Sequence, residues 1–127
     1  SLAVIDNFRD QEHYALIPVE LLKEKETIHE MSCKLDGNAN VICPSRFSRD
    51  EVEEITRSVI EAHKALYMNH YSRTDFIVHP KRGVYILEVN SLPELTDSGI
   101  FSKSLHEVGV KLSDMLHHVI QLALGRG

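Results

Sequence analysis

The strongest constraint on the fold is a pair of strand-like runs separated by a turn. Tyr71–Val78 and Val84–Asn90 are rich in β-branched and aromatic residues, and Pro80-Lys81-Arg82-Gly83 between them is typical of a turn. We therefore predict an antiparallel hairpin with those four residues as its loop. In that register His79 pairs with Val84.

Continuing this register places Asp75 opposite Glu88 and Arg73 opposite Asn90. Side chains alternate between faces, so these four residues share one face at the open end of the hairpin. Opposed carboxylates repel each other, and a bound cation reverses that effect. Carboxylate and amide oxygens suit Mg²⁺, which often joins carboxylates to nucleotide phosphates. We predict such a site here. The alternative is a surface hairpin with clustered charges, and a one-residue slip would scatter the set.

The other face of the hairpin is predicted to be nearly all apolar. Its members are Thr74, Phe76, Val78, Tyr85, Leu87 and Val89. The apolar residues Ile77, Val84 and Ile86 are placed on the site face, close to the turn. An apolar sheet face must be buried, so helices are expected to cover it.

The remaining elements follow from turn signals and hydrophobic periodicity. Ser48 and Glu51 form a capping box, which opens an amphipathic helix ending near Asn69. The other predicted helices are 101–107 and 112–123. The predicted strands are 2–5, 14–22, part of 26–34 and 41–43, with a polar turn region over 6–13. Together these elements predict an α+β fold, a mostly antiparallel sheet covered by helices, with the two long helices as candidates for covering the apolar hairpin face.

Bulk properties exclude some classes of function. The 127 residues carry a net charge of −5 and no Lys/Arg cluster, which argues against a nucleic-acid-binding face. No apolar run approaches the roughly 20 residues that cross a bilayer, and no signal peptide is visible. Cys33 and Cys43 lack metal-site spacing and indicate a reduced, cytoplasmic protein. The chain enters an apolar run directly after Ser1, which suggests a piece of a longer chain.

Several motifs in this order resemble the D-alanine–D-alanine ligases of the ATP-grasp superfamily. They are Val41-Ile42-Cys43-Pro44, Ala62-His63-Lys64-Ala65-Leu66, Tyr71-Ser72-Arg73-Thr74-Asp75-Phe76-Ile77-Val78, Leu87-Glu88-Val89-Asn90-Ser91-Leu92-Pro93 and Phe101-Ser102-Lys103. The resemblance covers residues 1–127 and implies the C-terminal ATP-grasp subdomain alone. It implies an ATP-dependent carboxylate–amine ligase of peptidoglycan precursor synthesis, acting on D-amino acids through an acyl phosphate. Members are often homodimers.

The resemblance also implies residue roles. Asp75, Glu88 and Asn90 would hold two Mg²⁺ ions, or Mn²⁺, that bridge the ATP phosphates, so Glu88 also contacts the cofactor. Arg73 would stabilise the phosphoryl group in transfer. Lys34 matches a Lys of a loop over the active site, although a solvated Lys beside a turn is an equal alternative.

The acceptor side departs from the family. Glu94 replaces a Gly, Gly99 replaces a Ser that holds the second substrate's carboxylate, and Leu35 replaces a loop Tyr. Ser102 replaces a common Pro, with little expected consequence. We predict retained nucleotide chemistry with an altered acceptor site. The alternatives are a ligase for another acceptor and a degenerate, non-catalytic module that binds nucleotide or a partner.

Two further expectations concern parts that the chain lacks and its histidines. Nothing resembles the family's N-terminal domain or its phosphate-gripping lysines, so the isolated chain is expected to be inactive. His63, His70 and His79 have no zinc-site spacing and are predicted to be solvent-facing or capping residues. Ser72 is predicted to lack a His–Asp partner.

Overall fold

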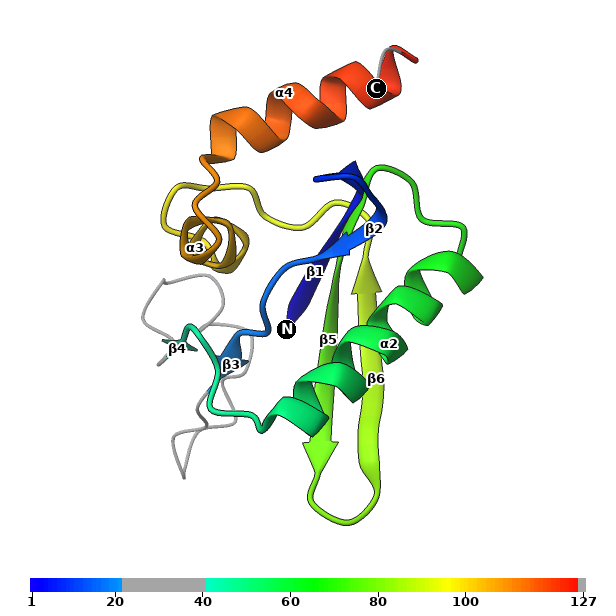
Figure 1. Ribbon diagram of the computed structural model, residues 1–127, viewed down its shortest axis with the longest axis vertical. Coiled ribbons are helices and arrows are strands. Elements are labelled where there is room, and N and C mark those ends of the chain that lie inside the picture. Colours follow the sequence, from blue (N-terminus) through cyan, green and yellow to red (C-terminus); the bar gives the residue numbers. More distant parts are fainter. Residues whose placement is uncertain (22–40, 126–127) are drawn as a thin grey trace.

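The computed structural model describes residues 1–21 and 41–125. The extended stretch predicted within 26–34 lies outside them. The strands are β1 (Leu2–Phe8), β2 (Gln11–Ala15), β3 (Glu20–Leu21), β4 (Val41–Ile42), β5 (Tyr71–His79) and β6 (Gly83–Asn90). The helices are α2 (Arg49–Ala65), α3 (Ile100–Glu107) and α4 (Leu112–Ala123). An antiparallel sheet in the order β2-β1-β5-β6, packed with helices, confirms the α+β prediction (Figure 1).

Helices pack on both sides of the sheet. The cluster beneath α2 contains Leu2, Val4, Ile55 and Val59. The cluster beneath α3 and α4 contains Ala3, Ile5, Leu16, Phe101, Leu105, Val110 and Met115. Among the described residues, α2 covers the hairpin face, whereas α4, the other candidate for this role, packs elsewhere (Figure 1). The reason is that β1 is an inner strand buried on both faces, which gives α4 a different apolar surface to cover.

The hairpin has the predicted pairing at its open end. Arg73 lies opposite Asn90, and Asp75 lies opposite Glu88. The register then shifts by one residue, and Leu87 becomes the extra residue of a β-bulge. Leu87 was expected on the covered face but is 61% exposed.

Near the turn the predicted register is wrong by one residue. His79 pairs with Gly83 rather than with Val84, so the loop contains three residues, Pro80 to Arg82. Gly83 has a φ of +82°, a conformation that glycine adopts without steric cost. The loop is one residue shorter than predicted, and the bulge adds one unpaired residue to β6. The two differences cancel, so the pairing at the open end is the predicted one.

The bulge also places the β6 side chains between it and the turn on the opposite sheet face from the predicted one. Val84 and Ile86 lie opposite Val78 and Phe76, on the face that α2 covers, and Tyr85 lies on the other face. These three assignments correct the sequence prediction. Packing agrees with the register, because Phe76, Val78 and Val84 contact the cluster beneath α2.

The predicted element boundaries hold in part. The capping box is present, with Glu51 N–H donating to Ser48 Oγ at 3.2 Å and Ser48 N–H donating to Glu51 Oε1 at 3.0 Å. The helix ends at Ala65, earlier than expected, and Tyr67 follows with a φ of 53°. Much of the turn region expected over 6–13 belongs to β1 and β2, which leave a tight turn between residues 8 and 11.

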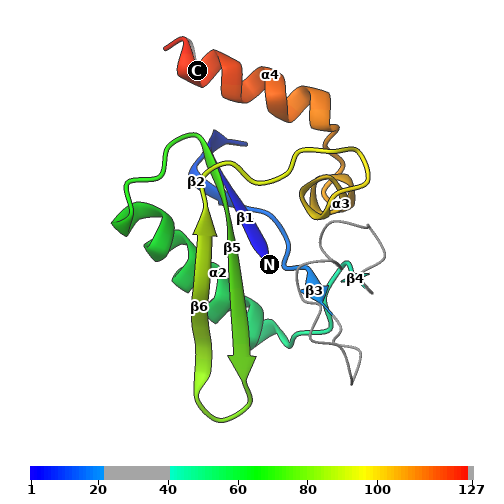
Figure 2. The ribbon, with the colours of Figure 1, turned by 180° about the vertical axis from the view of Figure 1, so that it is seen from behind.

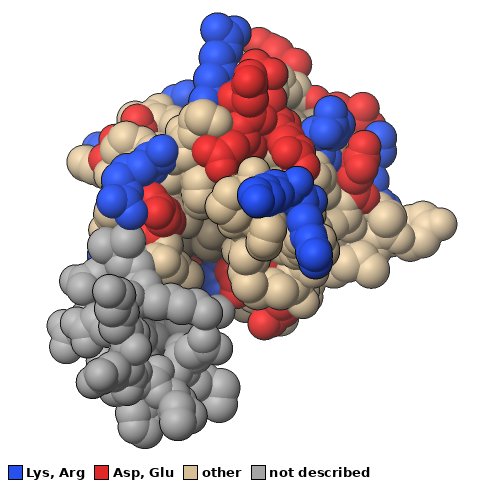
Figure 3. Space-filling view, turned by 90° about the horizontal axis from the view of Figure 1, so that it is seen from below, with Lys and Arg blue, Asp and Glu red and all other residues tan. Residues whose placement is uncertain are grey.

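One face of the molecule carries charged side chains of both signs among uncharged ones. Lys and Arg side chains lie beside Asp and Glu on the face shown in Figure 3. Among the described residues, no helix is both long enough and apolar enough to cross a membrane.

Candidate functional site

The open end of the hairpin brings four predicted site residues onto one sheet face. Two cross-strand pairs, Arg73 with Asn90 and Asp75 with Glu88, occupy neighbouring positions of that face. In Figure 2 this side of β5 and β6 faces the viewer, with α2 behind it. The structure therefore places these residues together, as the sequence predicts.

The two residues on β5 are held more firmly than those on β6. β5 is an inner strand, and Arg73 lies opposite Ala3 of β1. The side chains of Arg73 and Asp75 are each only 12% exposed, and Arg73 Nε lies 3.6 Å from Asp75 Oδ1. Glu88, on the edge strand, is exposed. A buried cation and carboxylate thus lie beside a carboxylate that is open to solvent.

The guanidinium of Arg73 is suited to an anionic ligand. Its Nε atom is buried and has no hydrogen-bond partner within the described residues. A buried donor without an acceptor costs about 1–3 kcal/mol, which a phosphate or oxyanion would relieve. The oxygen donors of Asp75, Glu88 and Asn90 are the ligand types that Mg²⁺ takes. Both observations fit a site for a metal–nucleotide complex.

Glu94 and Gly99 lie on the loop that leads into α3, and Ser102 lies in the first turn of that helix. Thr96 Oγ1 donates to Glu94 Oε1 at 3.0 Å, and Ser102 Oγ donates to the backbone carbonyl of Thr96. Gly99 is the N-cap of α3, and a Cβ atom there would lie 2.9 Å from Thr96 Oγ1. Thr96 therefore contacts the three substituted positions that lie in the described part of the chain. Lys34 and Leu35 lie outside the described residues.

One cavity in the described part of the chain lies away from the four hairpin residues. It measures about 610 Å³ and its lining includes Cys43, Lys103 and Lys111, but neither Arg73 nor Asp75. Burial raises the pKa of the Cys43 thiol, with Glu107 adding to the effect, so this thiol is a poor nucleophile. We assign the site from the chemistry of the hairpin rather than from cavity size.

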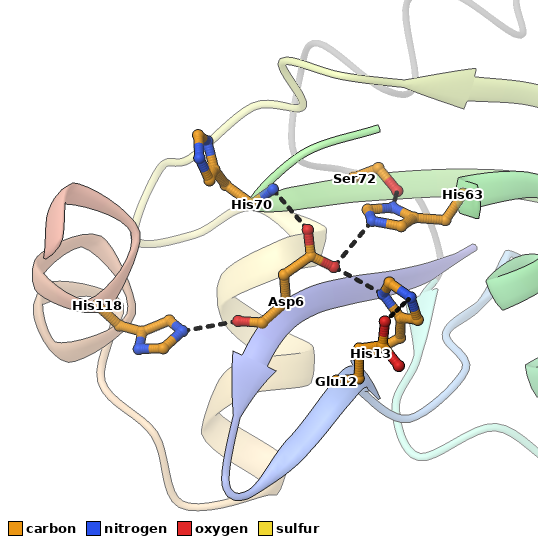
Figure 4. Close-up of polar contacts among 7 residues, drawn as sticks. All are labelled: Asp6, Glu12, His13, His63, His70, Ser72 and His118. Atoms are coloured by element: carbon orange, nitrogen blue, oxygen red, sulfur yellow. Dashed lines mark hydrogen bonds and ion pairs between the residues drawn. The ribbon is translucent and has the colours of Figure 1, made fainter. Parts of the chain in front are cut away.

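A second polar cluster, which the sequence analysis missed, surrounds Asp6 (Figure 4). Asp6 Oδ1 accepts from His13 Nδ1 at 2.9 Å and from His63 Nε2 at 3.0 Å. The other nitrogen of His63, Nδ1, lies 2.7 Å from Ser72 Oγ. His63 is fully buried, so its expected solvent-facing or capping role is wrong. Ser72 does have a His–Asp partner, which corrects the expectation that it has none.

This arrangement does not make Ser72 a catalytic nucleophile. Ser72 is fully buried, so its hydroxyl cannot reach a substrate. Burial lowers the pKa of His63, although the nearby Asp6 carboxylate opposes the shift. His63 is therefore neutral at pH 7, and the hydroxyl of Ser72 can donate to it or accept from it.

The contact between Asp6 and His13 could have been predicted from the sequence. Asp6 pairs directly with His13 across β1 and β2, so recognising a tight turn between these strands would have brought the two side chains together. His63 comes from the last turn of α2, and its approach depends on how that helix packs. No local pattern reports that packing.

Comparison with known proteins identifies the family. The family model described as "D-ala D-ala ligase C-terminus" matches residues 1–121. The chain belongs to this ligase family. The D-alanine–D-alanine ligase of Leptospira interrogans (serogroup Icterohaemorrhagiae serovar copenhageni, strain Fiocruz L1-130) is 29% identical over 128 residues. That alignment covers 99% of this chain and 36% of the relative.

Solved ligase structures share the fold. The D-alanine–D-alanine ligase from Coxiella burnetii superposes with a TM-score of 0.77 at 23% identity, covering 98% of this chain and 31% of that one. The Bacillus anthracis ligase complexed with ATP gives a TM-score of 0.74 at 20% identity, covering 97% and 37%. The chain thus spans about a third of the length of these ligases.

Proposed function

We propose that this chain forms the C-terminal catalytic part of an ATP-dependent D-alanine–D-alanine-type ligase. The observation that carries the proposal is the largely buried Arg73 on the same sheet face as three oxygen-donor residues, Asp75, Glu88 and Asn90, at the open end of the hairpin. Membership of the ligase family supports it. The reaction belongs to peptidoglycan precursor synthesis in the cytoplasm, and a homodimer is part of the same proposal.

Each residue of the hairpin has a role in this proposal. Asp75, Glu88 and Asn90 hold Mg²⁺, which, when bound, neutralises the charge on the ATP phosphates. Arg73 orients the transferring phosphoryl group and offers its donors to the oxyanion formed when the amine attacks the acyl phosphate. Its planar, always charged head serves both purposes better than a Lys would. The other contacts to ATP are assigned to parts of the ligase outside this chain.

The proposal for the acceptor site rests on the loop before α3. Glu94 adds a carboxylate there, and Gly99 lacks the hydroxyl with which the family holds the second substrate's carboxylate. Because Thr96 Oγ1 donates to Glu94, this hydroxyl is engaged within the loop. We therefore propose a weakened site for the second D-alanine, with an acceptor of different side chain as the alternative within the same reaction class.

The test is amino-acid-dependent release of ADP by the full-length protein with Mg²⁺, with dipeptide identified by mass spectrometry. D-alanine is expected to drive release with poor saturation at its second site. Dipeptide formation with ordinary saturation at both sites would remove the acceptor proposal and leave the ligase proposal standing. Bound ATP without release for any D-amino or hydroxy acid would favour a non-catalytic module.

A further inference from the structure

We propose that Asp6, His13 and His63 form a binding site for one zinc ion, separate from the site on the hairpin. The ligand atoms are Asp6 Oδ1, His13 Nδ1 and His63 Nε2. They come from β1, β2 and the last turn of α2. The proposal does not depend on the ligase function, because none of these residues belongs to the hairpin.

The spacing of the three atoms matches zinc coordination. All three lie within 4.8 Å of one another, and Asp6 Oδ1 is 2.9 Å from His13 Nδ1 and 3.0 Å from His63 Nε2. Zinc binds imidazole nitrogen and carboxylate oxygen at about 2.0–2.2 Å, so tetrahedral ligand atoms lie roughly 3.3 Å apart. Small side-chain movements therefore suffice to admit an ion among them.

Two of the three ligands, Asp6 and His63, form a further hydrogen bond through the polar atom that faces away from the proposed ion. His63 Nδ1 lies 2.7 Å from Ser72 Oγ, and His13 Nε2 lies 3.7 Å from Glu12 Oε1. Asp6 Oδ2 accepts from the backbone N–H of His70 at 2.7 Å, which leaves Oδ1 pointing at the two imidazoles (Figure 4). Metal-binding histidines typically donate their second N–H to such an acceptor. The cluster has this arrangement at His63, whereas the 3.7 Å separation at His13 is an ion-pair distance and too long for a hydrogen bond.

The hydrogen bond between His63 and Ser72 can form both without and with a bound ion. Without an ion, His63 donates from Nε2 to Asp6 and accepts from the hydroxyl of Ser72. With an ion, the proton moves to Nδ1 and is donated to Ser72, whose hydroxyl can accept equally well. The tautomer change requires no net gain or loss of protons by the imidazole.

The donor set and its exposure favour zinc. Two imidazoles and one carboxylate suit zinc better than Mg²⁺, which prefers oxygen ligands such as those on the hairpin. His63 is fully buried, but the side chains of His13 and Asp6 are 19% and 15% exposed. An ion can therefore enter from that side and keep water as its fourth ligand. Bound there, it would tie β1, β2 and α2 together.

The test measures zinc stoichiometry on the tag-free, metal-stripped full-length protein, by competition with a chromophoric chelator. His13→Gln is the informative variant because His13 lies at the rim. His117→Gln, which alters an exposed histidine of α4, is the matched control. The wild type and the control are expected to bind one more equivalent of zinc than His13→Gln. Equal stoichiometry in all three proteins would overturn the proposal.

Two further readouts separate coordination from folding. Cobalt bound in place of zinc should give tetrahedral visible bands without a thiolate charge-transfer band, because no cysteine is among the ligands. Zinc should raise the melting temperature of the wild type and the control, but not of a folded His13→Gln. Ferrous iron binding without zinc binding would overturn the choice of metal, and a thiolate band would overturn the ligand set.

Discussion

At the scale of single residues, the account rests on two buried polar groups with different requirements. Arg73 has a buried Nε without a hydrogen-bond partner in the described part of the chain, which indicates a site for an incoming anion. His63 is buried with partners on both nitrogens, which makes it part of the structure itself. The pairing of the two hairpin strands predicts the surroundings of Arg73 from the sequence. The surroundings of His63 were not predicted, because its partners are 57 and 9 residues away.

The buried His63 should make stability depend on pH. Its pKa is lowered by burial in the folded chain, so the unfolded chain binds a proton more readily. The stabilising contribution is present above the unfolded pKa of about 6.5 and is lost as pH falls towards the folded pKa, with a slope of at most about 1.4 kcal/mol per pH unit.

Urea unfolding between pH 5 and pH 8, with a chelator present, measures this dependence. The slope for the wild type is expected to exceed that of His63→Gln, which has no titratable group at this position. His117→Gln should retain the wild-type slope. The same slope in His63→Gln would show that other groups cause the dependence.

At the scale of elements, the hairpin shows how far local patterns carry. The paired carboxylates were predicted correctly even though the loop is one residue shorter than expected, because the bulge at Leu87 restores the register. The faces of the residues between turn and bulge were consequently wrong. A turn signal identifies the loop but does not fix its length to one residue, and a bulge has no sequence signature as clear as a turn.

The turn itself depends on Gly83. Its φ is +82°, and an added Cβ would lie 2.5 Å from Glu54 Oε1, the atom that accepts from the Val84 N–H at 3.3 Å. Gly83→Ala is expected to lower the free energy of unfolding by the left-handed penalty of about 1–2 kcal/mol and by the loss of this contact.

Gly109→Ala is the matched control for this substitution. Gly109 has a φ of +74° and nothing within 4 Å of an added Cβ, so it loses only the conformational contribution. Urea denaturation should therefore show the larger destabilisation for Gly83→Ala. Equal losses in the two variants would mean that Glu54 does not support the turn.

At the scale of the whole molecule, the two faces of the hairpin have different roles. One side of the hairpin packs on α2, and the other side carries the candidate site (Figure 2). The sequence motifs were sufficient to predict this division and the family. They could not predict that α4 packs with α3 on the β1 end rather than on the hairpin, because that choice depends on which strands lie inside the sheet.

The measurement that tests the central claim most directly compares carboxylate variants of the full-length protein for ADP release. Asp75→Asn and Glu88→Gln remove charge at the proposed metal site, and Glu53→Gln removes an exposed charge on α2. The first two are expected to lower kcat about 100-fold or more and to raise the Mg²⁺ concentration required, while Glu53→Gln keeps the wild-type rate. Wild-type kcat and Mg²⁺ dependence in Asp75→Asn and Glu88→Gln would contradict the account.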